Sequence, residues 1–436
     1  MKTIKKALIS SITILLIAGA NVFGGTVNTF NLSNGIKVIQ KEDSRNPLVT
    51  VHVFLRSGIA NETEKQAGLS SFTQLLMIKG TKTRNAEKLG IEIEDIGASI
   101  SSDVDYDFTS VGISLMSSYF GKGIELLSDI VFNPAFDKKE IEKERLNVLA
   151  GLKGRQDHIF EVANDEFNSR FYGNHPYSWN ESGKSETVSA FKREDFVKWH
   201  GIYYVPGNIF MVIAGDVNQK TAKEFAEKYF GGIKNTGGFS PSAAPQVREP
   251  APKKDVIATS KFQQAYYMIG FPAPALGQPD YATLKVINAM LGSRMSGRLF
   301  TELREKLSLA YEVNSFYPSR KQLSRFTVYL GLQKKNLKLA ETRTMEILDD
   351  LRNSPVQEEE LQDTKNYIKG IFLLDHQTIS RQAWYLGWWE AMGMGYDYDE
   401  KYLQSLLSVS TADIQNTAKK YFNEKFVQIE LVPEQQ

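Results

Sequence analysis

Residues 68–81 read Gly-Leu-Ser-Ser-Phe-Thr-Gln-Leu-Leu-Met-Ile-Lys-Gly-Thr, and the interpretation of the whole chain depends on this stretch. Its apolar residues recur at helical spacing, so we predict a helix over 65–79 that ends in the Lys-Gly-Thr turn. The predicted helix contains no histidine, cysteine, aspartate or glutamate. It therefore carries none of the side chains that usually bind a transition metal.

The composition of the 436-residue chain excludes several kinds of chemistry. There is no cysteine, so disulfides, iron–sulfur clusters, cysteine-bound zinc and a thiol nucleophile are all excluded. The formal net charge of +1 gives no electrostatic reason to expect nucleic-acid binding. The length indicates two domains, each large enough to bury its own core.

Five scattered histidines offer little for a metal site. His158 and Glu161 could share a helix face, but a lone His-x-x-Glu is a weak signal, and a solvated helix surface is the simpler interpretation. His175 is interpreted as a loop histidine and His52 as a residue on the face of a strand. No two histidines are close enough in sequence to share a helix face, and we predict no metal site from this set: His52, His158, His175, His200 and His376.

The N-terminus has the pattern of a secretory signal. Lys2, Lys5 and Lys6 precede an uncharged apolar run, and the small residues Ala18-Gly19-Ala20 close it. The alternative is an uncleaved anchor, but the glycines and asparagines that follow residue 20 make a poor membrane span. We therefore predict a signal peptide over 1–20 and an exported protein, periplasmic or secreted, with no membrane span in the mature chain.

The mature chain divides at a proline-rich stretch over 234–256, which is typical of an extended linker. The two halves resemble each other. Residues 137–154 and 357–374 share one helical layout, and residues 188–215 and 409–433 share a capped helix, a tyrosine-rich turn and an apolar strand. Two matches in the same order indicate an internal duplication. We predict domains over 26–233 and 257–436.

Each half alternates strands and helices irregularly, and no glycine-rich phosphate loop follows a strand. The simplest architecture is α+β: two homologous domains, each a mainly antiparallel sheet with helices packed on one face. The predicted strands are 48–55, 108–115, 210–214, 264–271, 311–316, 324–332 and 427–432. The predicted helices include 65–79, 85–96, 119–131, 138–155, 279–291, 296–306, 335–352 and 357–374.

The stretch at 68–81 resembles the zinc motif of the pitrilysin/insulinase (M16) peptidases, in which an H-x-x-E-H helix ends in a Lys-Gly-Thr turn. The family's two zinc-binding histidines fall on Ser71 and Leu75, and its general-base glutamate falls on Gln74. A hydroxyl is a poor zinc ligand, an isobutyl group cannot coordinate zinc, and an amide cannot accept a proton from zinc-bound water. The resemblance therefore implies an M16 scaffold with a degenerate zinc motif in the N-terminal domain.

The family's third zinc ligand, a glutamate on a later helix, should lie near Ala150 or Gly151. No carboxylate occurs between Arg145 and Gly154. All four positions of the site are thus changed together. The turn at 203–208, Tyr-Tyr-Val-Pro-Gly-Asn, also resembles the family's Tyr-Tyr-x-Pro-x-Asn turn, and the likeness extends from about residue 29 to the C-terminus.

The second half keeps another M16 signature over 292–311. The arginine and tyrosine with which the family holds the substrate backbone fall on Arg304 and Tyr311, and the resemblance implies a substrate-binding role for both. Arginine and tyrosine donors suit a peptide carbonyl that gains charge as water attacks. A surface ion pair for Arg304 and a packing role for Tyr311 are the simpler interpretations of each residue alone. Ser308 stands where the family usually has glycine.

These observations lead to two hypotheses of function. In the first, the chain is a non-catalytic subunit of a heterodimeric M16 peptidase. It is inactive alone and has no metal or cofactor of its own; a partner subunit binds the zinc, and this chain lends Arg304 and Tyr311 to an unfolded peptide held as an extra strand. In the second, the chain is a peptide-binding or scaffold protein of the same fold with no role in proteolysis.

Overall fold

A computed structural model of the chain describes residues 26–235, 244–259 and 261–434. The predicted signal peptide at 1–20 lies outside the described residues, as does part of the predicted linker. Strand β7 begins at Lys253, inside the last residues of that linker. Within the described ranges, no helix combines the length and the apolar character that a membrane crossing requires.

The first half is built on a six-stranded sheet. Its strands are β1 (Thr26–Asn31), β2 (Lys37–Glu42), β3 (Leu48–Leu55), β4 (Ser99–Val104), β5 (Thr109–Met116) and β6 (Ile209–Gly215). They lie in the order β1-β2-β6-β3-β5-β4. The β2–β6 pair is parallel, and all other neighbouring pairs are antiparallel. In the centre, Val51 of β3 lies opposite Ile113 of β5 and Ile213 of β6.

The second half repeats this arrangement. Its strands are β7 (Lys253–Thr259), β8 (Ala265–Ala273), β9 (Ala310–Phe316), β10 (Ser324–Leu332) and β11 (Val427–Pro433), in the order β7-β11-β8-β10-β9. The β7–β11 pair is parallel and the rest are antiparallel, so the order matches β2-β6-β3-β5-β4 strand for strand. The predicted α+β class, the mainly antiparallel sheets and the two homologous domains are confirmed.

Most helices of each half pack on one face of their own sheet. In the first half these helices are α1 (Leu69–Met77), α2 (Ala86–Asp95), α3 (Phe120–Phe132), α4 (Lys138–Arg155), α6 (Ser185–Ala190), α7 (Arg193–Tyr203) and α8 (Gln219–Ala226), which continues as a π-turn, η5 (Glu227–Gly231). In the second half they are α9 (Tyr281–Leu291), α10 (Leu337–Asn353), α11 (Glu358–Asp375), α13 (Tyr398–Ser408) and α14 (Thr411–Tyr421), with a π-turn, η6 (Phe300–Lys306). Short 3-10 turns complete the set: η1 (Ile59–Asn61), η2 (Glu64–Gln66), η3 (Ser117–Tyr119), η4 (Pro176–Ser178) and η7 (Lys334–Asn336).

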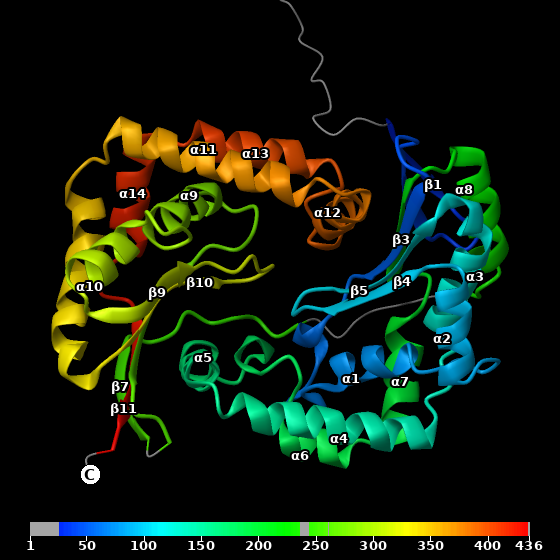
Figure 1. Cartoon of the computed structure of the whole chain (residues 1–436), viewed down its shortest axis with the longest axis horizontal. Coiled ribbons are helices and arrows are strands. Elements are labelled where there is room, and N and C mark those ends of the chain that lie inside the picture. Colours follow the sequence, from blue (N-terminus) through cyan, green and yellow to red (C-terminus); the bar gives the residue numbers. More distant parts are fainter. Residues whose placement is uncertain (1–25, 236–243, 260, 435–436) are drawn as a thin grey trace, which may run out of the picture.

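Two further helices cover the opposite faces of the sheets, and each comes from the other half (Figure 1). Helix α5 (Ile159–Tyr172) follows α4 in the first half and packs on β8 and β11 of the second sheet. Helix α12 (Ile379–Ala391) follows α11 in the second half and packs on β3 and β6 of the first sheet. The buried faces of both sheets therefore depend on an exchange of helices.

Alternation along β3 produces these two faces. Val51 and Val53 point into the core formed with the first half's own helices, whereas Phe54 points to the other side and joins the core that contains Trp389 of α12. A corresponding core forms around α5, where Phe167 packs among residues of β8 and β11. Each sheet is thus apolar on both faces.

Glycines let the exchanged helices approach closely. A Cβ placed on Gly387 of α12 would lie 1.9 Å from Cε2 of Phe54, and one placed on Gly270 of β8 would lie 2.4 Å from Cζ of Phe167. The Phe54 ring is fully buried and stacked on Phe210, with 5.3 Å between ring centroids, so it has little room to move.

The hairpin tips of the two sheets also meet at the centre of the molecule (Figure 1). The Arg320 guanidinium, between β9 and β10, lies 3.1 Å from a carboxylate oxygen of Asp105, between β4 and β5. It also lies over the Tyr106 ring at 4.2 Å from the centroid. The backbone N–H of Lys321 donates to Asp107 at 2.9 Å. Polar contacts thus fix the two sheets to each other where they are closest.

The predicted elements correspond to observed ones, with two kinds of difference. Residues 296–306 form a π-turn only over 300–306. Strands β1, β2, β4 and β7 and helices α6, α8, α12 and α13 were not predicted. Strand β4 reads Ser-Ile-Ser-Ser-Asp-Val and is largely exposed, so it shows neither the β-branched enrichment nor the alternation of apolar residues that marks a half-buried strand.

The close approach of α12 to β3 generates a stability prediction. Gly387→Ala should lower the free energy of unfolding by roughly 1–3 kcal/mol, because the added methyl group meets the immobile Phe54 ring. Gly370→Ala on α11 is the matched control: a Cβ there meets nothing within 4 Å, so the higher helix propensity of alanine should leave stability equal or increased. Urea denaturation of both variants measures the difference, and equal midpoints would contradict close packing at Gly387.

Candidate functional site

Helix α1 is held at its N-terminus by a buried carboxylate, Glu62. One oxygen of Glu62 accepts from the Ser70 backbone N–H at 2.7 Å and the other from the Gly68 backbone N–H at 3.0 Å. These bonds satisfy two of the amide groups that a helix start leaves open. Burial raises the pKa of Glu62 to about 7 despite these bonds. Glu62 therefore fixes where the helix begins.

The end of α1 is fixed by the predicted Lys-Gly-Thr turn. Lys79 Nζ lies 3.1 Å from Glu144 on α4, and the Thr81 hydroxyl donates to Asp129 on α3 at 2.6 Å. Gly80 has a φ of +125°, which residues with a side chain rarely adopt. These two contacts and the conformation of Gly80 fix the end of the helix.

Gln74 is buried on α1 and both ends of its amide are bonded. Its Nε2 donates to the Ser110 carbonyl of β5 at 2.8 Å, and its Oε1 accepts from the Tyr204 hydroxyl at 2.5 Å. The arrangement needs a donor on one side and an acceptor on the other, which an amide supplies and a carboxylate does not. Gln74 therefore has a complete structural role at this position.

Ser71 and Leu75, the other two changed positions of α1, are likewise occupied. The Ser71 hydroxyl donates to the Glu181 carbonyl at 2.6 Å, which fastens the loop between η4 and α6 to the helix. Leu75 is partly buried and packs against the core of the first half. A neutral hydroxyl is a poor zinc ligand, and an isobutyl group cannot coordinate zinc.

The fourth changed position lies on α4. Ala150 and Gly151 are exposed, and a Cβ on Gly151 would meet nothing within 4 Å. No structural contact of the described residues requires a small side chain at position 151. The absence of a carboxylate here is therefore not imposed by packing.

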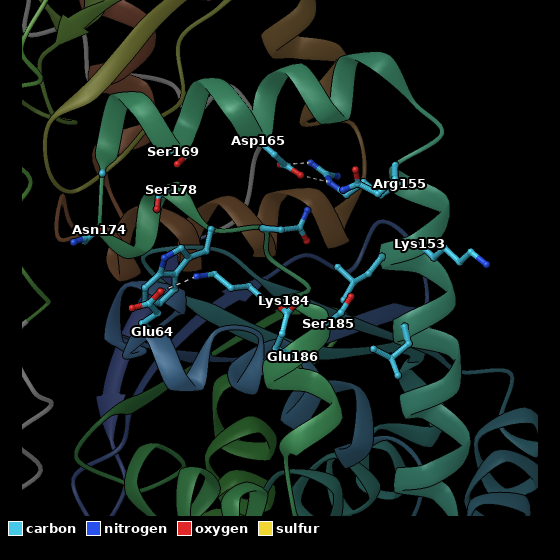
Figure 2. Close-up of a pocket in the computed structure, with 17 residues that line it drawn as sticks. Glu64, Lys153, Arg155, Asp165, Ser169, Asn174, Ser178, Lys184, Ser185 and Glu186 are labelled. Atoms are coloured by element: carbon cyan, nitrogen blue, oxygen red, sulfur yellow. Dashed lines mark hydrogen bonds and ion pairs between the residues drawn. The ribbon is translucent and has the colours of Figure 1, made fainter. Parts of the chain in front are cut away.

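A polar cleft of about 890 Å³ lies between α4, α5 and the loop after η4, whose Glu181 carbonyl accepts from Ser71 (Figure 2). Two ion pairs lie in its wall. Arg155 Nη2 and Nε donate to the Asp165 carboxylate at 2.9 and 3.0 Å, and Lys184 Nζ lies 3.0 Å from the Glu64 carboxylate. Its walls also present hydroxyl and amide groups, the charged groups of Lys153 and Glu186, and the apolar side chains of Leu149, Leu152 and Trp179. The cleft suits polar backbone groups better than a metal ion.

The histidines occupy structural positions, as the simpler interpretations predicted for His52 and His175. His175 Nδ1 accepts from the Tyr177 backbone N–H at 3.0 Å, and its Nε2 lies 2.9 Å from the Pro245 carbonyl. His52 is buried in β3, and burial lowers its pKa to about 4. His158 precedes α5 as its N-cap, while Glu161 pairs with Arg155. In the described part of the chain, no three His, Cys, Asp or Glu side chains are grouped as a metal site requires.

Arg304 and Tyr311 lie in the second half, on either side of the turn after η6. Arg304 is exposed and rests over the Phe300 ring at 4.9 Å from the centroid; no ion pair of the described residues involves it. Tyr311 is 52% exposed, and its hydroxyl oxygen accepts from Gln333 Nε2 at 2.5 Å. That bond leaves the hydroxyl proton available for another acceptor.

Ser308, which stands in this turn, has a φ of +51°. This left-handed conformation is the one that glycine adopts most easily, and it explains why glycine suits the position. Serine adopts this conformation here, so the turn forms without glycine at this position.

The structure brings the candidate residues together in two separate groups. Ser71, Gln74 and Leu75 share α1, whereas Arg304 and Tyr311 share the edge of the second sheet. Among the described residues, no hydrogen bond or ion pair joins one group to the other. Tyr204 was noted in sequence only as part of a turn, and its bond to Gln74 was missed because a residue 130 positions away gives no local signal.

Comparison with known protein families matches each half of the chain to a domain of one family. Residues 37–180 match the domain described as Insulinase (Peptidase family M16), and residues 190–368 match the domain described as Peptidase M16 inactive domain. An uncharacterised zinc protease of Bacillus subtilis is 23% identical over 400 residues, which cover 92% of this chain and 97% of that protein. Cytochrome b-c1 complex subunit 1 of Bos taurus is 28% identical over 263 residues, which cover 60% of this chain and 54% of that protein.

Solved structures share the fold over nearly the whole length. A protease from Helicobacter pylori has a TM-score of 0.88 at 21% identity and covers 94% of this chain and 100% of that chain. A peptidase M16 inactive domain from Pseudomonas fluorescens has a TM-score of 0.85 at 21% identity and covers 94% of this chain and 98% of that chain. With both halves matched in sequence and the two-sheet fold matched in structure, this chain belongs to the M16 peptidase family.

Proposed function

We propose that this chain is the non-catalytic subunit of a heterodimeric M16-type zinc peptidase. A partner subunit with an intact H-x-x-E-H motif binds the zinc and cleaves the peptide, and this chain closes the peptide chamber. Arg304 and Tyr311 contribute donors to the substrate at the partner's zinc site. The predicted signal peptide supports assembly of this pair outside the cytoplasm, in the periplasm or beyond.

The observation that carries the proposal is the state of helix α1. Its scaffold contacts, from Glu62 at the start to Lys79 at the end, are those of an ordered helix in a defined position. The side chains at the zinc positions are instead used in other bonds, most clearly Gln74 between Tyr204 and Ser110. The fold is thus maintained while the zinc chemistry is not.

The exposure of Arg304 and Tyr311 supports a role outside this chain's own fold. A guanidinium and a phenol with a free proton can both donate to a carbonyl oxygen that gains negative charge during hydrolysis. Neither group is buried or used in a described ion pair. Hydrogen-bond donors that are exposed in the isolated chain are available to a substrate held by the partner.

Strand β4 supports the binding of an extended peptide. It is the last strand of the first sheet, so its outer backbone groups have no strand partner among the described residues. Its exposed side chains are polar: Ser99, Ser101, Ser102 and Asp103. An added strand would gain main-chain hydrogen bonds there with little dependence on sequence.

A scaffold protein with no role in proteolysis is the second candidate. The similarity to a subunit of the cytochrome b-c1 complex favours it, because that relative is named as a component of an assembly rather than as a protease. On this alternative, Arg304 and Tyr311 are dispensable. The two candidates therefore differ in what those residues do.

Restoring the family's glutamate at position 74 should harm the fold. Gln74→Glu replaces the donor that faces the Ser110 carbonyl with an oxygen, so we expect the free energy of unfolding to fall by roughly 1–3 kcal/mol. Gln66→Glu is the matched control. Gln66 Oε1 accepts from the backbone N–H and the hydroxyl of Thr63, and a carboxylate oxygen can accept both of these bonds as well. Urea denaturation compares the two. A Gln74→Glu protein as stable as wild type would contradict the role assigned to this amide.

The isolated chain should not hold zinc tightly. After dialysis against a weak chelator, metal analysis of the purified chain should give far less than one zinc per chain, because Ser71, Gln74 and Leu75 supply no suitable ligand. An M16 homologue with an intact motif, treated in the same way, is the positive control. One tightly bound zinc per chain would overturn the proposed division of labour.

Reconstitution tests the subunit role directly. Adding this chain to a zinc-motif homologue from the same organism should raise cleavage of an unfolded, fluorogenic peptide. Arg304→Ala and Tyr311→Phe should each lower kcat/KM of the pair on the order of tenfold or more, since each removes a donor to the developing charge. Size-exclusion chromatography should show unchanged assembly.

Lys306→Ala is the control for Arg304→Ala, because it removes an exposed cation from the same turn and leaves both donors in place. Full activity of the homologue alone, without complex formation, would reject the subunit role. Unchanged turnover in both donor variants would favour the scaffold alternative.

A further inference from the structure

A second cavity, separate from the zinc-motif helix, lies in the centre of the molecule beside the exchanged helix α12. It has a volume of about 430 Å³, within the usual range for ligand pockets. Its walls come from α9, α11, α12 and α13 and from both hairpin tips. Seven of its thirteen lining residues are aromatic: Tyr281, Phe372, Trp384, Tyr385, Trp388, Trp389 and Tyr402.

Three of the chain's five tryptophans line this pocket. Trp384 and Trp388, one turn apart on α12, are stacked with their planes 11° apart and their centroids 5.9 Å apart. Both are only half-buried, whereas Trp389 behind them is 1% exposed. Large apolar side chains that stay partly exposed next to a cavity indicate a surface that awaits a partner.

The charged groups of the pocket already have partners, within its walls or directly behind them. Arg320 is paired with Asp105 at 3.1 Å, and Arg381 is paired with Asp375 at 2.7 Å. Asp399 accepts from Trp389 Nε1 at 2.7 Å and lies 2.8 Å from His376 Nε2. Each charged side chain of the pocket therefore already has a polar partner, which leaves less to repay the desolvation of a charged ligand.

The phenolic groups are also bonded within the walls. The Tyr385 hydroxyl donates to Asp375, and the Tyr281 hydroxyl lies 2.5 Å from the Ser319 hydroxyl. The principal surfaces left for a ligand are therefore ring faces and edges. Such surfaces favour another aromatic ring, which gains from offset or edge-to-face contact in addition to its buried area.

The pocket lies next to the free edge of β4, and this position indicates that the ring would belong to a peptide bound along that edge. Asp105, which lines the pocket, directly follows the last residue of β4. The outer edge of β4 has no strand partner among the described residues. A peptide that extends along this edge would therefore pass the mouth of the pocket and could place one side chain in it.

We propose that this pocket is a specificity site that binds an uncharged aromatic side chain of an extended peptide. It rests on the proposed function only in that the chain binds extended peptides; it needs neither a zinc-binding partner nor cleavage. The pocket gives the non-catalytic chain a preference of its own among unfolded peptides. Trp384 and Trp388 are the residues that contact the bound ring.

Calorimetric titration of the full mature chain, without a partner, tests the preference. The probes are acetylated and amidated pentapeptides, Ala-Ala-X-Ala-Ala, in which X is Phe, Leu, Lys or Ala. The Phe peptide should bind with a Kd about tenfold lower than the Ala peptide, with Leu between them and Lys no better than Ala. Equal Kd values for Phe and Ala, or tightest binding of the Lys peptide, would overturn the proposal.

Trp388→Leu should bring the Phe and Ala peptides to within about twofold of each other, because it keeps an apolar wall but removes the ring. Tyr119→Ala, which removes a 43% exposed aromatic side chain that does not line the pocket, should leave the preference unchanged. If Trp388→Leu fails to fold, the NMR signals of the indole N–H groups in the wild-type protein provide the test instead. The Phe peptide should shift the signals of Trp384 and Trp388 but not that of Trp199, and unshifted pocket signals would overturn the proposal.

The two proposals can fail separately. A chain that prefers the Phe peptide but never raises cleavage by a zinc-motif homologue would retain the pocket and lose the subunit role. A chain that raises cleavage without any preference for the Phe peptide would do the reverse.

Discussion

The exchange of helices between the two halves is the contact on which the rest of the structure depends. Each half builds a sheet that is apolar on both faces but supplies most of its own helices to only one of them. The uncovered face of the first sheet is closed by α12, and that of the second sheet by α5. Neither half could bury its sheet alone, because an exposed apolar sheet face is unfavourable in water. The chain therefore folds as one body although it is built from a repeated unit.

Because the fold depends on packing contacts, it can be kept when the residues at the family's zinc positions are changed. Helix α1 contributes Leu69, Phe72 and Leu76 to the core of the first half, and these positions are unrelated to the zinc ligands. Once Gln74 is bonded to Tyr204 and Ser110, the helix is stabilised by contacts that a catalytic glutamate would not make. Packing keeps the helix in place whether or not a metal is bound.

Sequence could predict the elements whose patterns are local and the positions that align with a known motif. The helix over 65–79 and the central strands follow from periodicity, and the duplication follows from two matched segments in the same order. The changed residues Ser71, Gln74 and Leu75 follow from the resemblance to the family's zinc motif. The exchange of α5 and α12 could not be predicted in this way, since it depends on Gly387 meeting Phe54 and Phe167 meeting Gly270, pairs that are far apart in the chain. The aromatic pocket was missed for the same reason: its lining residues come from four helices and both hairpin tips, which are far apart in the chain.

Loss of the zinc ligands and retention of peptide binding are compatible on physical grounds. Zinc binding needs specific side chains at fixed positions, so four substitutions are enough to remove it. Binding of a peptide along a sheet edge uses backbone N–H and C=O groups, which no side-chain substitution removes as long as the strand persists. Strand β4 persists because it pairs along its whole length with β5, whose inner residues are buried in the core. Changes at the zinc-motif positions therefore leave the strand edge, and the backbone groups that a peptide would use there, in place.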